Sequence, residues 1–235
     1  MYNHLLFDAD GTLFDFKAAE RHALEALFHE LEIEATERMK NLYSEVNHAI
    51  WLELEQGAIT IEALKTERFR RFFDILQLAH DPKKASERYL DFLSQSDHLI
   101  PKAIELLTAL RQRGYRLSLI TNGISRVQRG RLAATKTLSF FEHVVISEEI
   151  GSQKPDPAFF TALFTITGME GEDRKRALVI GDSLSSDIKG AIGAKLDSCW
   201  YNPDRTNADP QQRPTYQIAS LDELLELLPK EAVTS

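Results

Sequence analysis

Short apolar segments that end abruptly in a polar residue constrain the fold of this chain more than any other feature. Three of them are residues 4–7 (HLLF) before Asp8, residues 116–120 (RLSLI) before Thr121 and residues 177–180 (ALVI) before Gly181 and Asp182. A short apolar segment that closes on a polar or Gly-containing turn is typical of a buried strand that delivers its last residues to a loop. The sequence therefore predicts a sheet whose strands end in polar side chains.

The segments between these strands divide the chain into two parts. From residue 101 onward, helical patterns alternate with strands, which implies right-handed crossovers and a parallel sheet covered on both faces. Residues 17–97 differ, because they contain one glycine and one proline and place apolar residues at helical spacing. We expect roughly four helices there. The sequence thus predicts a Rossmann-like three-layer α/β core, formed by residues 1–16 and 98–235, with an inserted helical domain at residues 17–97.

Composition narrows the possible partners and the compartment. The net charge of −8 and the lack of a basic cluster argue against nucleic-acid polymers as partners. Cys199 is the only cysteine, so an intramolecular disulfide and a multi-cysteine metal site are impossible, and we expect this thiol to be buried. No apolar stretch approaches membrane-spanning length, and residues 1–4 do not begin a secretion signal. We expect a cytoplasmic protein, either a monomer or a homodimer.

The polar residues that follow the strands are expected to form one site. Open parallel sheets bind ligands outside the carboxyl ends of their strands, where the strand order reverses. Asp8, Asp10 and Asp182 are expected at that position, together with Thr121 and Asn122. Each of these residues alone is more often a helix cap or a turn residue. Their shared position at strand ends favours a common function.

The residue types indicate the chemistry. Three carboxylates in one place would repel one another and raise their own pKa values unless a cation held them. Oxygen ligands suit Mg²⁺, the usual ion where phosphate is also bound. Asp8 can attack phosphorus to form an aspartyl-phosphate, and Asp10 can protonate the leaving oxygen. Thr121, Asn122 and a lysine would hold the transferred group. These residues predict Mg²⁺-dependent phosphoryl transfer from a small phosphorylated metabolite.

Four segments resemble the four motifs of the haloacid dehalogenase (HAD) superfamily of phosphohydrolases, in the superfamily's order. They are residues 8–12 (DADGT), Thr121, Lys154 within residues 151–157 (GSQKPDP), and residues 181–187 (GDSLSSD). The combination is highly specific, whereas an Asp-x-Asp pattern alone is weak. The resemblance implies the superfamily's α/β core. It also implies that residues 17–97 are a C1-type helical cap, which closes over the substrate and excludes water.

The resemblance also implies a role for each matching residue. Asp8 matches the nucleophile and a metal ligand, and Asp10 matches the general acid/base, whose backbone carbonyl binds the metal. Lys154 matches the lysine that neutralises the charge of the nucleophile and the phosphate. The remaining roles are phosphate contacts for Thr121, Asn122 and Gly123, direct Mg²⁺ coordination for Asp182, and support through water or Lys154 for Asp187.

Asp10 also separates branches of the superfamily. The dehalogenases lack an aspartate there because a halide leaves without a proton, whereas an alkoxide needs one, so a phosphate ester is favoured. Residues 47–51 (NHAIW), 56–60 (QGAIT) and 199–202 (CWYN) further resemble the noncanonical pyrimidine 5'-nucleotidases. That resemblance implies hydrolysis of nucleoside 5'-monophosphates. A sugar-phosphate phosphatase, a phosphotransferase or mutase, and a non-catalytic regulatory module are the alternatives.

Three residues of the helical segment are candidates for contact with the substrate, and two of them have an alternative interpretation. Trp51 can stack on a nucleobase, but Ile50 and Leu54 beside it favour a place in the core of the cap. Asn47 and Arg68 are candidate substrate contacts, since an arginine suits an anion or the edge of a base. The charged stretch around Arg68 instead favours an exposed helix face.

Overall fold

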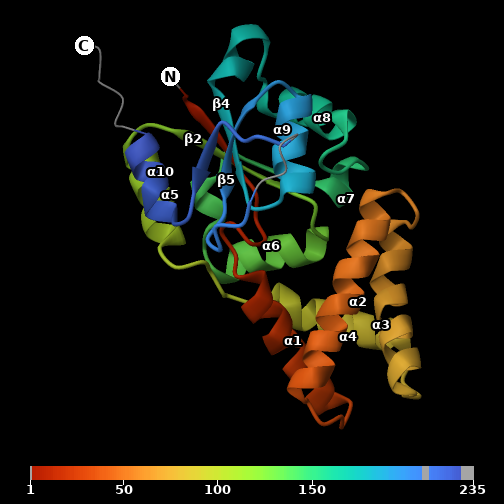
Figure 1. The fold of residues 1–235 in the computed structure, drawn as a ribbon. Coiled ribbons are helices and arrows are strands. Elements are labelled where there is room, and N and C mark those ends of the chain that lie inside the picture. Colours follow the sequence, from red (N-terminus) through yellow and green to blue (C-terminus); the bar gives the residue numbers. More distant parts are fainter. Residues whose placement is uncertain (1, 208–211, 229–235) are drawn as a thin grey trace.

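The computed structural model of this protein describes residues 2–207 and 212–228, in which six strands form one sheet with helices on both faces (Figure 1). All the strand pairs are parallel, and the spatial order is β3-β2-β1-β4-β5-β6. The predicted parallel α/β core is confirmed. The strands are β1 (His4–Phe7), β2 (Arg116–Thr121), β3 (His143–Ile146), β4 (Ala177–Gly181), β5 (Asp197–Tyr201) and β6 (Tyr216–Ile218).

The first four helices, which follow β1 in the sequence, form a block at one side of the sheet (Figure 1). That block consists of α1 (Phe16–Glu30), α2 (Glu37–Glu55), α3 (Ile61–Leu76) and α4 (Pro82–Ser94). The others are α5 (Ala103–Gln112), α6 (Ser125–Ala134), η1 (Leu138–Phe140), α7 (Ser147–Ile150), α8 (Pro157–Thr167), η2 (Gly171–Arg176), η3 (Leu184–Ile188), α9 (Lys189–Gly193) and α10 (Leu221–Leu227).

Strand β6 was not expected from the sequence. It has three residues and follows a loop rich in Asn, Asp, Pro and Gln, part of which lies outside the described residues. No apolar segment marks it, because it lies at the edge of the sheet and pairs only with β5, where Ile218 is the partner of Tyr201. A short edge strand exposes few unpaired backbone groups to other chains.

The two faces of the sheet have separate apolar cores. Successive residues of a strand point to opposite faces, so Leu5 and Phe7 of β1 pack with α5 and α10, whereas Leu6 packs with α8 and α9. Cys199 is buried in the first of these cores, as predicted. Because both faces are covered, the central strands are continuous apolar segments rather than alternating ones.

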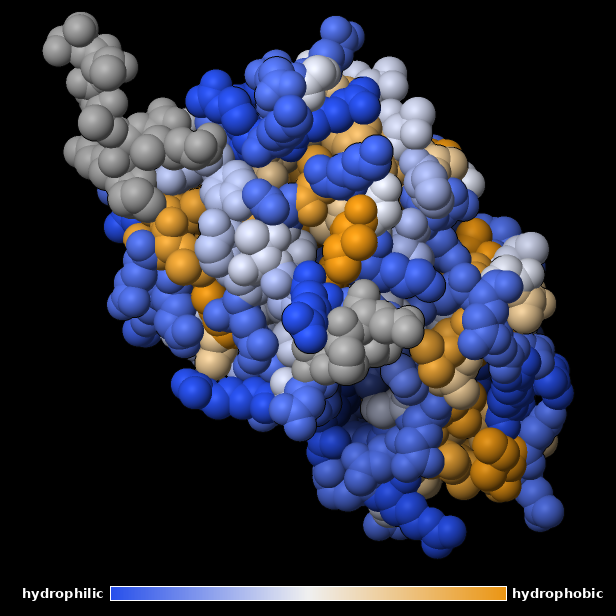
Figure 2. Space-filling model, turned by 45° about the horizontal axis from the view of Figure 1, so that its top comes forward, coloured by the Kyte–Doolittle hydropathy of each residue, from blue (hydrophilic) through white to orange (hydrophobic). Residues whose placement is uncertain are grey.

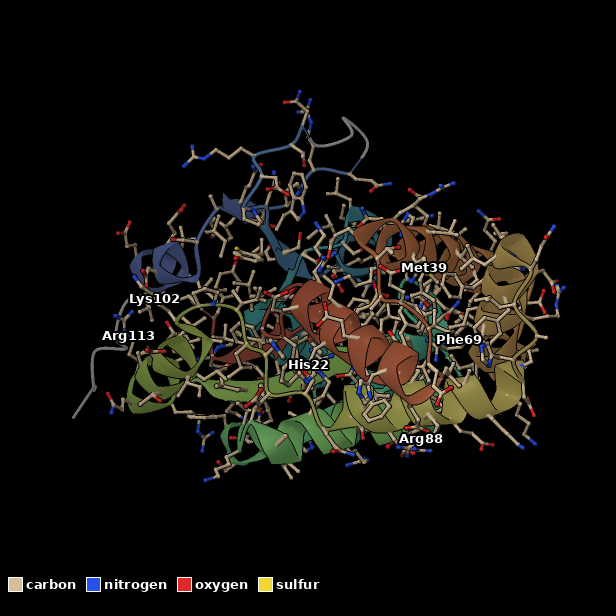
Figure 3. All side chains as sticks on the ribbon, turned by 90° about the horizontal axis from the view of Figure 1, so that it is seen from below. His22, Met39, Phe69, Arg88, Lys102 and Arg113 are labelled. Carbon is tan, nitrogen blue, oxygen red and sulfur yellow. The ribbon has the colours of Figure 1, made fainter. Side chains whose placement is uncertain are left out.

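The helical block has its own core and joins the sheet through two adjacent chain segments. Its centre is aromatic, with Tyr43, Phe69, Phe72 and Tyr89 among its buried residues. Figure 3 shows the labelled Phe69 among these helices. The chain enters the block and leaves it at neighbouring positions, where the Asp15 N–H donates to the carbonyl of His98 at 3.2 Å.

Helix α4 of the block packs directly on α6 of the core. A Cβ atom on Gly130 of α6 would lie 2.5 Å from the carbonyl oxygen of Ser94, so the two backbones approach closely where the glycine stands. The position of α6, and of the side chains that it carries, therefore depends on the helical block as well as on the sheet. This contact matters for the site, because α6 follows β2 and starts beside the carboxyl ends of the strands.

The face in Figure 2 is mostly hydrophilic, with apolar side chains in small separate areas. The exposed large apolar residues come from seven different elements and are Leu52, Ile75, Ile104, Leu138, Ile166, Ile192 and Leu227. None of the helices in the described part of the chain is long and apolar enough to cross a lipid bilayer.

Acid should destabilise this fold through His4, which is 1% exposed in β1 and hydrogen-bonded to Ser118 at 2.8 Å. Burial, with a smaller contribution from Arg116, lowers the pKa of His4 to about 4. A lowered folded-state pKa means that the stabilisation is complete above the unfolded pKa near ~6.5 and is lost as the pH falls from there through 4. We expect a loss of about 2 kcal/mol at pH ~5 from this group.

The measurement is the free energy of unfolding against pH for the unaltered chain and for His4→Asn. The two curves should be parallel above pH ~6.5, and below it the curve of the unaltered chain should fall more steeply than that of His4→Asn. The matched control is His29→Asn, because His29 is exposed. Parallel curves for the unaltered chain and His4→Asn would show that His4 does not cause the acid sensitivity.

Candidate active site

Asp8 occupies the point at which the strand order reverses. The chain passes from β1 outward to β2 and β3, then returns to place β4 on the other side of β1. Ligands of open parallel sheets bind outside the carboxyl ends of the strands at such a point. Asp8 is the first residue after β1, and its N–H donates to the carbonyl of Ile180 in β4 at 2.8 Å. The neighbouring strands thus fix the backbone of Asp8.

Lys154 connects three of the loops at this end of the sheet. Its Nζ lies 2.7 Å from Asp8 Oδ1 and 2.7 Å from Asp187 Oδ1, and it donates to the carbonyl of Ile120 at 2.8 Å. These three acceptors satisfy all three ammonium donors. Burial by itself would lower the pKa of Lys154, but Asp187 and Asp8 outweigh it and raise that pKa. The lysine therefore stays charged in a buried position.

A third carboxylate, Asp182, completes an acidic cluster around the lysine. Oxygens of Asp8, Asp182 and Asp187 lie within 4.8 Å of one another. Burial raises the pKa of Asp182 to about 7, with Asp187 as the next cause, and burial also raises the pKa of Asp8, which Lys154 opposes. Three ionised carboxylates and one ammonium leave a charge of −2, and the available donors are all oxygens. This combination fits a hard divalent cation.

Gly11 is the residue that allows Asp182 to reach this cluster. Its φ of +84° lies in the region that glycine adopts without strain. A Cβ atom at this position would lie 2.3 Å from Asp182 Oδ2, which is too close for any side chain. The glycine in the first motif is therefore required by the carboxylate of the fourth.

The residues after β2 divide into two kinds. The Asn122 side chain accepts from the Lys154 N–H and donates to the Lys154 carbonyl, each at 2.7 Å. It therefore holds the backbone of the lysine and leaves the second hydrogen of its Nδ2 for another acceptor. Thr121 Oγ1 accepts from the Gly123 N–H at 3.2 Å, at the wall of the pocket that also holds Asp8.

Asp10 is held apart from the acidic cluster by two residues that the sequence motifs do not include. Gln128 Nε2 donates to Asp10 Oδ2 at 2.5 Å, and Arg131 donates to Asp10 Oδ1. The Arg131 guanidinium is fully buried and lies 4.4 Å above the ring of Phe14. Both residues lie on α6, three positions apart, and therefore on one helix face. That spacing after the Thr121 strand is the sequence signal that points to them.

The cluster opens into a pocket of about 240 Å³ between the sheet and the helical block. Asp8, Asp10, Thr121, Asn122, Gly123, Lys154, Asp182 and Asp187 all line it, so the structure brings every candidate site residue together. The helical block contributes Phe16, Trp51 and Glu55 to the same wall. Trp51 is half-buried, because it lines the pocket and also packs on the core of the block.

The expectation of an exposed face for Arg68 is wrong. Arg68 is 2% exposed, with its guanidinium 4.8 Å from the centre of the Tyr89 ring and 5.7 Å from that of Phe69. The surrounding charges mislead because they lie on the outer face of α3, where Arg70 pairs with Glu67 and Asp74. Helical position, rather than local composition, decides which arginine is buried.

The sequence of this chain is similar to a family model and to named proteins. Residues 2–195 match the family model of haloacid dehalogenase-like hydrolases. The chain is 38% identical over 229 residues to the pyrimidine 5'-nucleotidase PynA of Streptococcus pneumoniae, and the match covers 97% of this chain and 96% of PynA. It is 34% identical over 229 residues to the pyrimidine 5'-nucleotidase YjjG of Escherichia coli, covering 97% and 99% of the two chains.

A solved structure agrees with this relationship. The HAD-hydrolase YfnB from Bacillus subtilis, crystallised with magnesium, superposes with a TM-score of 0.90 at 36% identity, covering 97% of this chain and 98% of YfnB. The family model spans most of the chain, the relatives span nearly all of it, and the motif residues converge on one pocket. This chain therefore belongs to the haloacid dehalogenase-like hydrolases.

Proposed function

We propose that this chain is a Mg²⁺-dependent phosphomonoesterase that hydrolyses nucleoside 5'-monophosphates through an aspartyl-phosphate on Asp8. The observation that carries the proposal is the position of Asp8: its carboxylate is held 2.7 Å from Lys154 and faces a pocket of about 240 Å³. The names of PynA and YjjG, both pyrimidine 5'-nucleotidases, support the choice of a nucleotide as substrate.

The acidic cluster suits Mg²⁺, a hard cation that prefers oxygen ligands. Asp8 and Asp182 would hold it, with the backbone carbonyl of Asp10 as the third protein ligand and Asp187 in support through Lys154. The donors are oxygens, and magnesium binds YfnB, whose fold is the same. When bound, the ion would neutralise the charge that develops on the transferred phosphoryl oxygens.

The chain's own residues account for the remaining chemistry. An oxygen of Asp8 attacks phosphorus, the bond from phosphorus to the ester oxygen breaks, and Asp10 gives a proton to the departing alkoxide. Lys154 neutralises the negative charge beside Asp8, and the loop of Thr121 and Gly123 holds the phosphoryl oxygens in the meantime. Water then attacks the aspartyl-phosphate while Asp10 takes its proton. The products are a nucleoside, inorganic phosphate and free Asp8.

Asp10 must exchange partners during this cycle. In the present structure both of its oxygens accept hydrogen bonds, one from Arg131 and one from Gln128. A proton donor needs one of those oxygens free. We therefore expect a bound substrate to displace one of the two contacts.

Residues 17–97 would form a cap over the catalytic pocket. The Lys65–Glu148 ion pair, at 2.6 Å, holds this cap to the core.

A panel of phosphate esters with Mg²⁺, repeated with a chelator, tests the proposed function. We expect phosphate release from nucleoside 5'-monophosphates to exceed that from sugar phosphates, and to stop with the chelator. Isomerisation of sugar phosphates without net phosphate release would instead indicate a mutase.

Asp8→Asn should fold normally and lose at least about a thousandfold in kcat, because no nucleophile remains.

Asp10→Asn should separate the two half-reactions. With a nucleotide, both steps need the carboxyl, so we expect kcat to fall by about a hundredfold or more. With p-nitrophenyl phosphate the first step needs no proton, because p-nitrophenolate is a good leaving group. The variant should therefore release a burst of about one p-nitrophenolate per site and then turn over slowly. Normal steady-state turnover of the nucleotide would rule out the acid/base role.

Gly11→Ala should impair metal binding. The new Cβ would meet Asp182 Oδ2 at 2.3 Å and displace that carboxylate. We expect the Mg²⁺ concentration for half-maximal activity to rise at least about tenfold. The matched control is Gly168→Ala, because Gly168 also has a positive φ, +66°, but a Cβ there would meet no atom within 4 Å. Equal Mg²⁺ requirements for Gly11→Ala and Gly168→Ala would show that a Cβ at residue 11 does not disturb the metal ligand Asp182.

A further inference from the structure

The catalytic pocket continues into a narrow cavity between the core and the helical block. This cavity, of about 30 Å³, shares Asp10, Phe16, Trp51 and Gly123 with the catalytic pocket. Its wall within the block includes Arg68. Its volume holds one or two groups the size of a water molecule. A ring lying against Trp51 in the wider pocket could therefore insert an exocyclic atom here, but a second fused ring would not fit.

Arg68 is a buried cation with donors to spare. Its Nε and Nη2 have no hydrogen-bond partner among the residues that the structure describes, although the side chain is 2% exposed. Glu20 of the same block interacts electrostatically with Arg68, but its oxygens accept hydrogen bonds from Ser44 and Asn47 instead. Leaving buried donors unsatisfied is costly, so their retention beside a cavity points to an acceptor that arrives with a ligand.

Helix α2 adds a flat ring, Trp51, to the walls of both cavities and a buried acceptor, Asn47, one turn earlier. Asn47, Trp51 and Glu55 are four residues apart along α2, so they lie on one face, and the last two line the catalytic pocket. Asn47 donates to Glu20 at 3.0 Å, and its Oδ1 has no partner among the described residues. The Trp51 ring offers the apolar surface on which a planar heterocycle stacks.

We propose that Arg68, Trp51 and Asn47 form the subsite that recognises the base of the substrate. Arg68 donates to an exocyclic carbonyl oxygen of a single-ring base, Trp51 stacks on the ring, and Asn47 supplies an acceptor nearby. The assignment rests on the proposed nucleotidase function. The chemistry favours pyrimidines, because their carbonyl oxygens suit the guanidinium and their single ring suits the size of the cavity.

The test compares substrates with and without a base. Kinetics are measured with uridine and cytidine 5'-monophosphates and with ribose 5-phosphate for Arg68→Met, Arg68→Lys and Trp51→Leu. We expect Arg68→Met and Trp51→Leu to lower kcat/KM for the nucleotides at least about tenfold, mainly through KM, with less than about a threefold change for ribose 5-phosphate. Arg68→Lys should recover part of the loss.

The matched control is Arg70→Met, on the same helix but exposed and paired with Glu67 and Asp74. Arg70→Met should leave kcat/KM unchanged for all three substrates. An equal loss for nucleotides and ribose 5-phosphate in both Arg68→Met and Trp51→Leu would overturn the subsite but not the nucleotidase function. If the unaltered chain cleaved ribose 5-phosphate and no nucleotide, the proposed function would fail, and the subsite with it. Trp51→Leu decides the question if Arg68→Met does not fold.

Discussion

The buried Lys154 ammonium is the interaction on which the rest of the site depends. It comes from the loop after β3 and α7, whereas its partners Asp8 and Asp187 follow β1 and β4, so one cation joins segments far apart in the sequence. Burying a charge is costly unless it is paired and fully hydrogen-bonded, and here all three donors have acceptors. Asn122 fixes the lysine backbone from the neighbouring strand end. Removing either carboxylate would leave a buried charge only partly compensated, which explains why the loops meet in one arrangement.

Two aspartates separated by a single residue receive different environments from this arrangement. Asp8 is enclosed with other carboxylates and the lysine, where burial raises its pKa and an added cation would favour its ionised, nucleophilic form. Asp10 instead lies against the guanidinium of Arg131 and the amide of Gln128. Different surroundings are how a site gives different roles to groups of the same type. Helix α6 carries both partners of Asp10 and packs closely on α4, so the proposed acid/base and the helical block are mechanically connected.

The helical block combines an aromatic core with polar groups that this core leaves unpaired. Arg68 and Asn47 have buried atoms without partners, and both lie on helices that face the catalytic pocket or its extension. In a block that served only to cover the pocket, apolar residues of similar size would avoid the cost of burying these groups. The proposed division is therefore that the sheet performs the phosphoryl chemistry, while the block selects the molecule that carries the phosphate.

The sequence by itself determined the parallel sheet and the polar strand ends, because apolar strand length, helical spacing and turn residues are local properties. The convergence of Asp8, Thr121, Lys154 and Asp182 followed from the order of motifs along the chain. Only the tertiary structure decided the rest. β6 forms because an edge is available beside β5, Arg131 reaches Asp10 because α6 crosses beside the first loop, and Arg68 is buried because α3 turns that face toward Tyr89. Each depends on contacts between segments distant in sequence, which neither composition nor periodicity encodes.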